Sequence, residues 1–338
     1  MHGAGSQRVV VPLRRSASHS RSRKLIGAVS RRLTRYIRTR PVVFRRALRE
    51  ALDLQQGITR GRRIVADDPL WLLAPAWLLA ERRDRDCLAD ILFAQCCLFL
   101  AIRIHDDLVD RQAQGAWLIL VGDDLLFEAQ SQLARHVEAP AFWSYFRSAA
   151  TKTLHGIAEV DRLQTQPAGM PASARWLYAD VSAILSIGVA AAFARRTRLA
   201  HYPKFARLFD DLAIASQLLD DLEDLEEDAA RGRLNVAATL VIRSRRAATQ
   251  FRRTPVRHKI LTHRMVLEGR ADVVVRLARQ HSMRARRMAS AVGCLQAVEY
   301  ASRMIQYCDA VAKATHDARV DVLFSRLYRG SRRRRLGN

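Results

Sequence analysis

Several features of small, secreted or fibrous proteins are scarce in this sequence. Its 338 residues contain 15 glycines, 9 prolines and 5 cysteines, and 49% of the residues are hydrophobic. So few helix-breaking residues beside so many apolar ones favour a globular, helix-rich protein over a disordered one. The cysteines show neither the paired spacing of a zinc site nor a disulfide framework, so we expect reduced thiols and a cytoplasmic location.

The sequence also lacks a long hydrophobic segment. Its longest apolar runs, residues 69–80 and 184–194, are too short to cross a bilayer as single helices. No apolar stretch followed by a small-residue cleavage site is present at the N-terminus, so no secretory signal is expected. We therefore interpret the apolar runs as buried core helices.

Acidic residues are missing from the two ends of the chain. The net charge is +24, of which residues 1–63 carry +15 and residues 326–338 carry +6, leaving +3 for the body. We interpret residues 1–45 as a basic, disordered extension and residues 326–338 as a solvated basic tail. A transit peptide and contact with an anionic membrane are alternative interpretations. Because the body is nearly neutral, no nucleic-acid partner is expected.

From about residue 46 onward, apolar residues recur at helical spacing between breaks that contain proline, glycine or aspartate. The pattern predicts helices at 43–56, 70–82, 86–109, 117–136, 140–164, 174–195, 203–229, 233–250, 257–281 and 285–316. There is no alternating strand pattern and no short repeat. The sequence thus predicts a single all-α domain over residues 46–325.

Two acidic clusters stand inside these apolar segments, a little over a hundred residues apart. Residues 105–110 read His-Asp-Asp-Leu-Val-Asp, and residues 220–224 read Asp-Asp-Leu-Glu-Asp. Carboxylates at positions i, i+3 and i+4 share one helical face, where they repel one another unless a cation lies between them. Such oxygen ligands suit Mg²⁺, with Mn²⁺ as an alternative. We predict that the metal ligands, which are also the catalytic groups, are Asp106, Asp107, Asp110, Asp220, Asp221 and Asp224.

Carboxylates on two helices can hold metal ions against a phosphate-bearing substrate. The metals neutralise a diphosphate and stabilise the charge that develops as it leaves. If the diphosphate leaves an allylic carbon, the remaining fragment is a carbocation, which an apolar, water-excluding cavity protects.

The two clusters resemble the aspartate-rich motifs of the class I isoprenoid synthases. Residues 105–110 look like the first motif of trans-polyprenyl diphosphate synthases, and residues 217–224, with Gln217 leading, look like the second. Residues 121–126 are similar to the segment that follows the first motif. The resemblance implies an all-α isoprenoid synthase-type bundle around a central cavity and an enzyme that acts on prenyl diphosphates. We also expect a homodimer.

A second resemblance overlaps the first. Residues 224–233 are similar to the second motif of squalene and phytoene synthases and the stretch after it, with Asn235 where those enzymes usually carry tyrosine. Asp106 and Asp110 also fit the DxxxD pattern of that family. The resemblance therefore leaves head-to-head coupling open.

Departures from the chain-elongating pattern concern the second substrate. Residues 65–68 read Val-Ala-Asp-Asp where elongating enzymes carry basic residues for isopentenyl diphosphate. Residues 112–115 read Gln-Ala-Gln-Gly where those enzymes carry an arginine pair and a glycine, and residues 181–182 read Val-Ser where they carry Lys-Thr. We predict a terpene synthase-like enzyme that ionises a C15 or C20 allylic diphosphate, leading to cyclisation or elimination. The alternatives are prenyl transfer, by elongation or head-to-head coupling, a degenerate inactive paralogue, and a non-catalytic basic protein that binds nucleic acid or anionic membrane.

Four residues near the clusters are candidates for binding the substrate diphosphate. Arg103 lies one helical turn before the first aspartates and either contacts the diphosphate or offsets the carboxylates. The other three follow from the position of the second motif: Gln217, Arg231 and Arg233.

Overall fold

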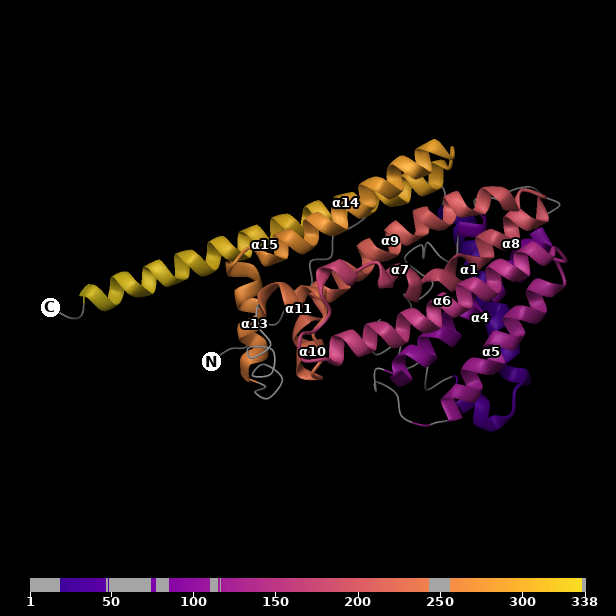
Figure 1. Cartoon of the computed structure of the whole chain (residues 1–338), viewed down its shortest axis with the longest axis horizontal. Helices are drawn as coiled ribbons and strands as arrows, with labels where there is room; N and C mark the ends of the chain where they lie inside the picture. Colours follow the sequence, from indigo (N-terminus) through magenta and orange to yellow (C-terminus); the bar gives the residue numbers. More distant parts are fainter. Residues whose placement is uncertain are drawn as a thin grey trace.

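The computed structural model describes residues 19–46, 48, 74–76, 85–109, 115, 117–242 and 256–335, and the secondary structure within these ranges is entirely helical (Figure 1). The longer helices are α1 (His19–Thr39), α4 (Arg85–Val109), α5 (Trp117–Ala134), α6 (Pro140–Thr165), α8 (Ile187–Arg195), α9 (Tyr202–Glu223), α13 (Val256–Leu267), α14 (Arg270–Ala291) and α15 (Leu295–Arg335). Shorter ones are α7 (Leu177–Val181), α10 (Leu225–Ala230) and α11 (Val236–Val241). The predicted all-α fold is confirmed.

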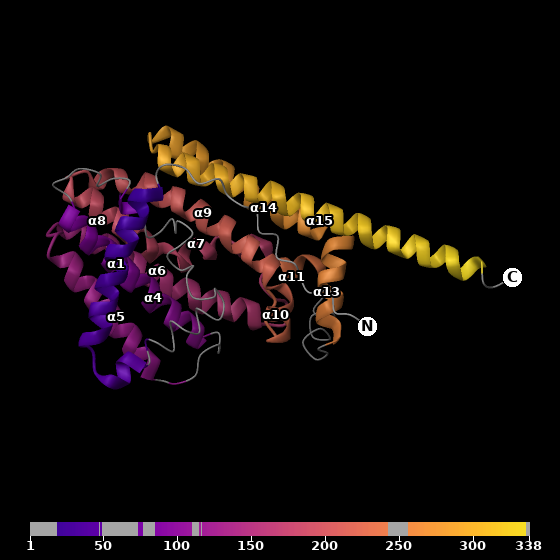
Figure 2. The ribbon, with the colours of Figure 1, turned by 180° about the vertical axis from the view of Figure 1, so that it is seen from behind.

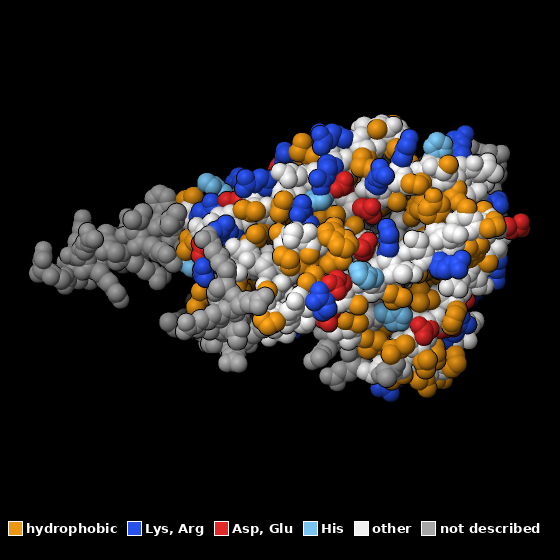
Figure 3. All heavy atoms as spheres, in the orientation of Figure 1, with side chains coloured by type: hydrophobic (Ala, Val, Ile, Leu, Met, Phe, Trp, Pro, Cys, Tyr) orange, Lys and Arg blue, Asp and Glu red, His pale blue; other side chains and the backbone are white. Residues whose placement is uncertain are grey.

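The helices form an elongated bundle. Helices α4 and α5 pack along each other, and α9 packs along α14, which in turn pairs with α15 as an antiparallel hairpin. Helices α10, α11 and α13 lie at the opposite end of the bundle from α5 and α8, and α15 continues past them toward the C-terminus (Figures 1 and 2). On the face shown in Figure 3, Lys and Arg side chains gather along the edge formed by α14.

Helix α4 is the central core helix. Its residues Cys87–Val109 are long and apolar enough to cross a membrane, which corrects the expectation that the sequence lacks such a segment, but 78% of the most apolar stretch is buried against the rest of the protein. Close packing around it depends on small residues. The backbone N–H of Gly188 donates to Gln95 Oε1 at 2.7 Å, and a Cβ at Gly188 would collide with that oxygen. This hydrogen bond joins α8 to α4 about three helical turns before the first acidic cluster.

Helix α1 corrects the prediction of disorder over residues 1–45, which is wrong for residues 19–39. Val29 and Tyr36 are buried, and Leu25 and Leu33 pack against the same core. These four positions follow a 3.6-residue period, so the helix buries a narrow apolar stripe between its arginines. Residues 1–18 lie outside the described residues.

Several helix boundaries also differ from the prediction. The segment predicted at 203–229 divides at Asp224 into α9 and α10, and the segment predicted at 174–195 divides into α7 and α8 with short 3₁₀ turns. Helix α14 runs through the predicted break at 281–285, and the chain turns instead at Gly293, whose φ is 69°. Glycine adopts this left-handed conformation without steric cost.

Candidate active site

The first acidic cluster occupies the last turn of α4. Asp107 is buried, and Asp106 is partly exposed. Arg103, one turn earlier, lies between them: its Nη1 is 3.4 Å from Asp106 Oδ2 and its Nη2 is 3.1 Å from Asp107 Oδ1. The i, i+3 and i, i+4 spacing allows one guanidinium to face both carboxylates. Asp110 lies outside the described residues.

Helix α5 supports this turn of α4 from the side. The His105 ring packs on Gly122, where any Cβ would overlap the imidazole. His105 Nε2 also lies 3.6 Å from Asp123 Oδ1. The segment 121–126, which sequence resemblance associated with the first motif, therefore packs beside the residue that precedes Asp106.

The second cluster lies at the end of α9. Asp220 and Asp224 are one helical turn apart and both are exposed to solvent. Asp220 is exposed as a whole residue, but its carboxyl group is partly shielded from water by the surrounding protein. This shielding and the charges of Glu223 and Asp224 raise its pKa to about 7. Burial and the neighbouring Glu227 and Glu223 carboxylates raise the pKa of Asp224 as well. The cluster thus holds more negative charge than its surroundings balance.

Arg103 connects the two clusters electrostatically. Its positive charge opposes the rise in pKa at both Asp220 and Asp224, although it belongs to α4 and they belong to α9. Coulombic influence of this kind decays quickly with distance in a solvated site. The positive charge of Arg103 therefore acts on carboxylates of both clusters.

Asp221 has a different environment from Asp220. It is 2% exposed, and its Oδ2 accepts hydrogen bonds from the Tyr178 hydroxyl at 2.7 Å and from the Val236 backbone N–H at 3.1 Å. Burial raises its pKa well above the usual range. The carboxylate joins α9 to α7 and α11, which corrects its predicted assignment as a metal ligand.

The two arginines that follow the second cluster, both predicted to bind diphosphate, also differ in their environment. Arg233 is 7% exposed and donates to Gln164 Oε1 and Asp161 Oδ1, each at 2.9 Å, so it ties the segment after α10 to α6. This position corrects its predicted role in diphosphate binding. Arg231 pairs with Glu227 at 2.5 Å, and its charge acts to lower the pKa of Asp224. Arg231 therefore lies near the second cluster.

Gln217 lies one turn before Asp220 on α9 and is partly buried. Positions 217, 220 and 224 share one face of a helix, so Gln217 extends the line of the acidic pair toward the middle of the bundle. Its predicted role in diphosphate binding stays a prediction.

Two residues near the site were not among the predicted site residues. Tyr307 of α15 donates a hydrogen bond to Glu223 Oε1 at 2.6 Å, and the negative charge of Asp220 contributes to raising its pKa. Asn235 donates to the Asp221 carbonyl at 3.1 Å and to Asp228 Oδ2 at 2.8 Å. No local signal marks Tyr307, because it comes from a helix that begins about seventy residues after the second motif.

The donor chemistry of the site fits Mg²⁺. Within the described ranges no three acidic, His or Cys side chains converge closely enough to form a metal-binding group. However, the two clusters supply hard oxygen donors with excess negative charge, which suits Mg²⁺ when substrate phosphates and water complete the coordination. The residues present therefore suit this ion better than a softer metal.

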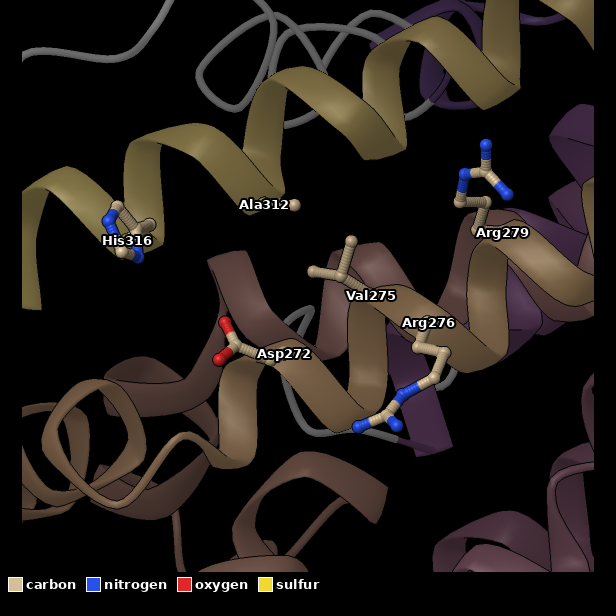
Figure 4. Close-up of a pocket in the computed structure, with 6 residues that line it drawn as sticks. All are labelled: Asp272, Val275, Arg276, Arg279, Ala312 and His316. Atoms are coloured by element: carbon tan, nitrogen blue, oxygen red, sulfur yellow. The ribbon is translucent and has the colours of Figure 1, made fainter.

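A separate recess lies between α14 and α15, with a volume of about 290 Å³ (Figure 4). Asp272, Arg276, Arg279 and His316 contribute its polar side chains. Asp272 is paired with Arg319 at 2.5 Å, and Arg279 is paired with Asp309 at 2.7 Å. These ion pairs join the two helices, and none of the cluster aspartates lines the recess.

Comparisons with known proteins connect this geometry to one fold. No protein-family model and no curated protein matches the chain. Among solved structures, it is similar to an octaprenyl pyrophosphate synthase from Helicobacter pylori, with a TM-score of 0.65, 13% identity, and coverage of 84% of this chain and 99% of the other. It is also similar to a heptaprenyl diphosphate synthase from Staphylococcus aureus, with a TM-score of 0.66, 12% identity, and coverage of 86% and 98%.

A third similar structure is a geranylgeranyl pyrophosphate synthetase from the archaeon Geoglobus acetivorans, with a TM-score of 0.62, 16% identity, and coverage of 86% and 99%. Similarity at such low identity concerns the fold, and it extends over nearly the whole length of each of these proteins. The chain has the all-α isoprenoid synthase fold that the resemblance of its aspartate-rich motifs predicted.

Proposed function

We propose that this protein is a Mg²⁺-dependent enzyme that ionises an allylic prenyl diphosphate and transfers the prenyl group to an acceptor. The observation that supports the proposal is that Arg103 of α4 pairs with Asp106 and Asp107, while its charge also acts on Asp220 and Asp224 of the second cluster. Two acidic clusters that share the influence of one arginine inside this fold suit a substrate that brings its own phosphates.

In this proposal the four aspartates hold Mg²⁺, or Mn²⁺ in its place, and the metal supplies charge neutralisation for the leaving diphosphate. Gln217 on α9 and Arg231, just after α10, orient the diphosphate. Arg103 adds a fixed positive charge between the two pairs. The apolar residues of α4 that precede the first cluster, including Leu98 and Ala101, keep water away from the prenyl chain.

Prenyl transfer is favoured over cyclisation because the similar solved structures are named as synthases of prenyl diphosphates. A specific observation nevertheless supports cyclisation or elimination as a second candidate. Residues 65–68, which lie outside the described residues, read Val-Ala-Asp-Asp, and carboxylates there would repel the diphosphate of a second substrate. The two candidates differ in their need for an acceptor.

Incubation with C10, C15 and C20 allylic diphosphates and Mg²⁺, with and without isopentenyl diphosphate, separates them. Longer prenyl diphosphates that form only when isopentenyl diphosphate is present indicate elongation. Hydrocarbons or alcohols that form from one allylic substrate alone indicate cyclisation or elimination. If the protein releases diphosphate from none of these substrates, the proposed function is contradicted.

Two variants test the site directly. Asp107→Asn and Asp220→Asn should each lower the rate of diphosphate release by on the order of 10²-fold or more, because each removes charge that stabilises the leaving group. Asp317→Asn is the matched control, since Asp317 is exposed on α15 and pairs only with Lys313 among described residues. Equal rates for all three variants would refute the assignment.

We further propose that the protein forms a homodimer through α5. Leu120 and Phe127 are 58% and 67% exposed and lie two turns apart on one face of this helix. A second copy would cover these apolar side chains. Light scattering should show a dimer for the wild-type protein and a monomer for Phe127→Asp, and an unchanged mass for the variant would exclude this face.

A further inference from the structure

The outer face of α1 is a concentrated basic surface. The helix contains no acidic residue, and Arg31, Arg35 and Arg38 are exposed at positions i, i+4 and i+7. This spacing places the three guanidinium groups on one side of the helix. The opposite side packs on the core through Val29 and Tyr36.

Other arginines of the same segment are used inside the protein. Arg32 forms an ion pair with Asp90 of α4. Arg40 pairs with Asp124 at 2.8 Å and with Glu128 at 3.2 Å, both on α5. These pairs hold α1 in place and leave the outer three arginines without an acidic partner within the described ranges.

Two exposed aliphatic side chains follow the basic helix closely in the chain. Val42 and Val43, just after α1 ends, are each 68% exposed. A solvated basic helix has no need of apolar side chains at its edge. Basic residues next to exposed aliphatic ones match the chemistry of a bilayer surface, where anionic headgroups lie above hydrocarbon.

We propose that the face formed by Arg31, Arg35, Arg38, Val42 and Val43 docks this protein on an anionic lipid bilayer. The arginines pair with headgroup phosphates, and the two valines enter the boundary between headgroups and acyl chains. A nucleic acid fits this face less well, because valines neither stack on bases nor donate hydrogen bonds to them. The surface and its partner do not depend on the proposed reaction.

The docking face is rigidly connected to the candidate active site. The Tyr36 hydroxyl donates to Asp124 on α5, and Arg40 pairs with the same carboxylate. Asp123, the preceding residue of α5, lies 3.6 Å from the His105 ring of α4. Docking through α1 therefore fixes how the first acidic cluster is oriented relative to the membrane.

The test is flotation of the full-length protein with vesicles of phosphatidylcholine alone or with one quarter phosphatidylglycerol. Wild-type protein should float only with the anionic vesicles, and binding should weaken as salt is raised. Each arginine near an anionic surface contributes about fivefold in affinity, so the triple variant Arg31→Gln, Arg35→Gln, Arg38→Gln should bind on the order of 10²-fold more weakly.

A second triple variant controls for net charge. Arg147, Arg198 and Arg207 are exposed on other parts of the protein, so changing all three to Gln removes the same charge and should change vesicle binding less than threefold. Val42→Ser with Val43→Ser should weaken binding several-fold even at high salt, because it removes only apolar contact. Circular dichroism checks that each variant is folded.

Equal weakening in the two triple variants would overturn the proposal, since it would assign binding to overall charge. Binding to duplex DNA that depends on the α1 arginines, without binding to anionic vesicles, would overturn it in favour of a nucleic-acid surface. Loss of flotation leaves the enzymatic assay unaffected, and absence of turnover leaves flotation unaffected, so the two proposals fail independently.

Discussion

Replacing Arg103 with Gln tests whether one side chain links the two acidic clusters. The change removes the positive charge and keeps a polar group of similar reach on α4. In the wild-type protein Arg103 faces Asp106 at 3.4 Å and Asp107 at 3.1 Å, and its charge also reaches Asp220 and Asp224. The variant should therefore be destabilised, because carboxylates of both clusters lose a nearby positive charge at once.

The size of the effect follows from the exposure of the groups. The Arg103 side chain is 33% exposed, whereas that of Asp107 is 11% exposed. A hydrogen bond to a charged group contributes roughly 1.5–3 kcal/mol, and an exposed ion pair less than about 1 kcal/mol. The partly exposed pair lies between these two cases, so the free energy of unfolding should fall by about 2 kcal/mol. For a domain this large, that lowers the melting temperature by about 2–4 °C.

The assay is thermal unfolding followed by circular dichroism, with and without Mg²⁺. Arg147→Gln is the control, because Arg147 is exposed on α6 and should change stability by less than about 0.5 kcal/mol. If a divalent cation can replace the missing charge, Mg²⁺ should narrow the difference between Arg103→Gln and wild type. A variant as stable as the control, with or without Mg²⁺, would refute the electrostatic link.

Three further predictions concern packing, pH and the C-terminal helix. Gly156→Ala should cost about 1–3 kcal/mol in urea unfolding, since its Cβ would lie 2.6 Å from the Val181 backbone nitrogen; unchanged stability would contradict the close approach of α6 and α7. Burial raises the pKa of Asp210 from 3.8 to about 6, so wild type loses stability as pH rises between these values. The free energy of unfolding of Asp210→Asn should equal that of wild type near pH 4 and exceed it by about 1–2 kcal/mol at pH 7. Equal free energies of unfolding at pH 7 would show that the carboxyl group is solvated. Tyr307→Phe loses the hydrogen bond to Glu223 and should lower stability by about 1 kcal/mol with diphosphate release unchanged, whereas a large fall in that rate would assign Tyr307 to the chemistry.

Helices bounded by strong local signals could be predicted from the sequence. The predicted 140–164 corresponds to α6, Pro140–Thr165, because proline fits the first turn of a helix. The boundary at Asp224 could not be predicted, since neither glycine nor proline marks it and only the packing of α9 and α10 against their neighbours separates the two helices. Helix α1 was missed because its arginines dominate the composition, while its apolar stripe is only one residue wide per turn.

Some features of the candidate site could likewise be predicted from the sequence, and others could not. Spacing predicts that Asp106 or Asp107 shares a helical face with Asp110, which lies outside the described residues. The structure adds that Arg103 contacts both Asp106 and Asp107. The position of Arg233 inside the bundle depends on Gln164 and Asp161, about seventy residues earlier in the chain. Only the tertiary structure reveals such partners, so basic residues near a motif cannot be assigned to a substrate from the sequence.

The two aspartate doublets show why adjacent acids need not have the same role. Consecutive residues in an α-helix point about 100° apart, so a doublet cannot direct both carboxylates to one ligand unless something spans the angle. Arg103 spans Asp106 and Asp107, but no described residue bridges Asp220 and Asp221 in this way. Asp221 instead accepts hydrogen bonds from Tyr178 and from the first residue of α11. Asp221→Ala leaves both donors buried without an acceptor, at about 1–3 kcal/mol each. It should therefore lower the melting temperature, whereas Asp220→Asn should lower the rate of diphosphate release with the fold intact; the reverse result would show that the two carboxylates have exchanged roles.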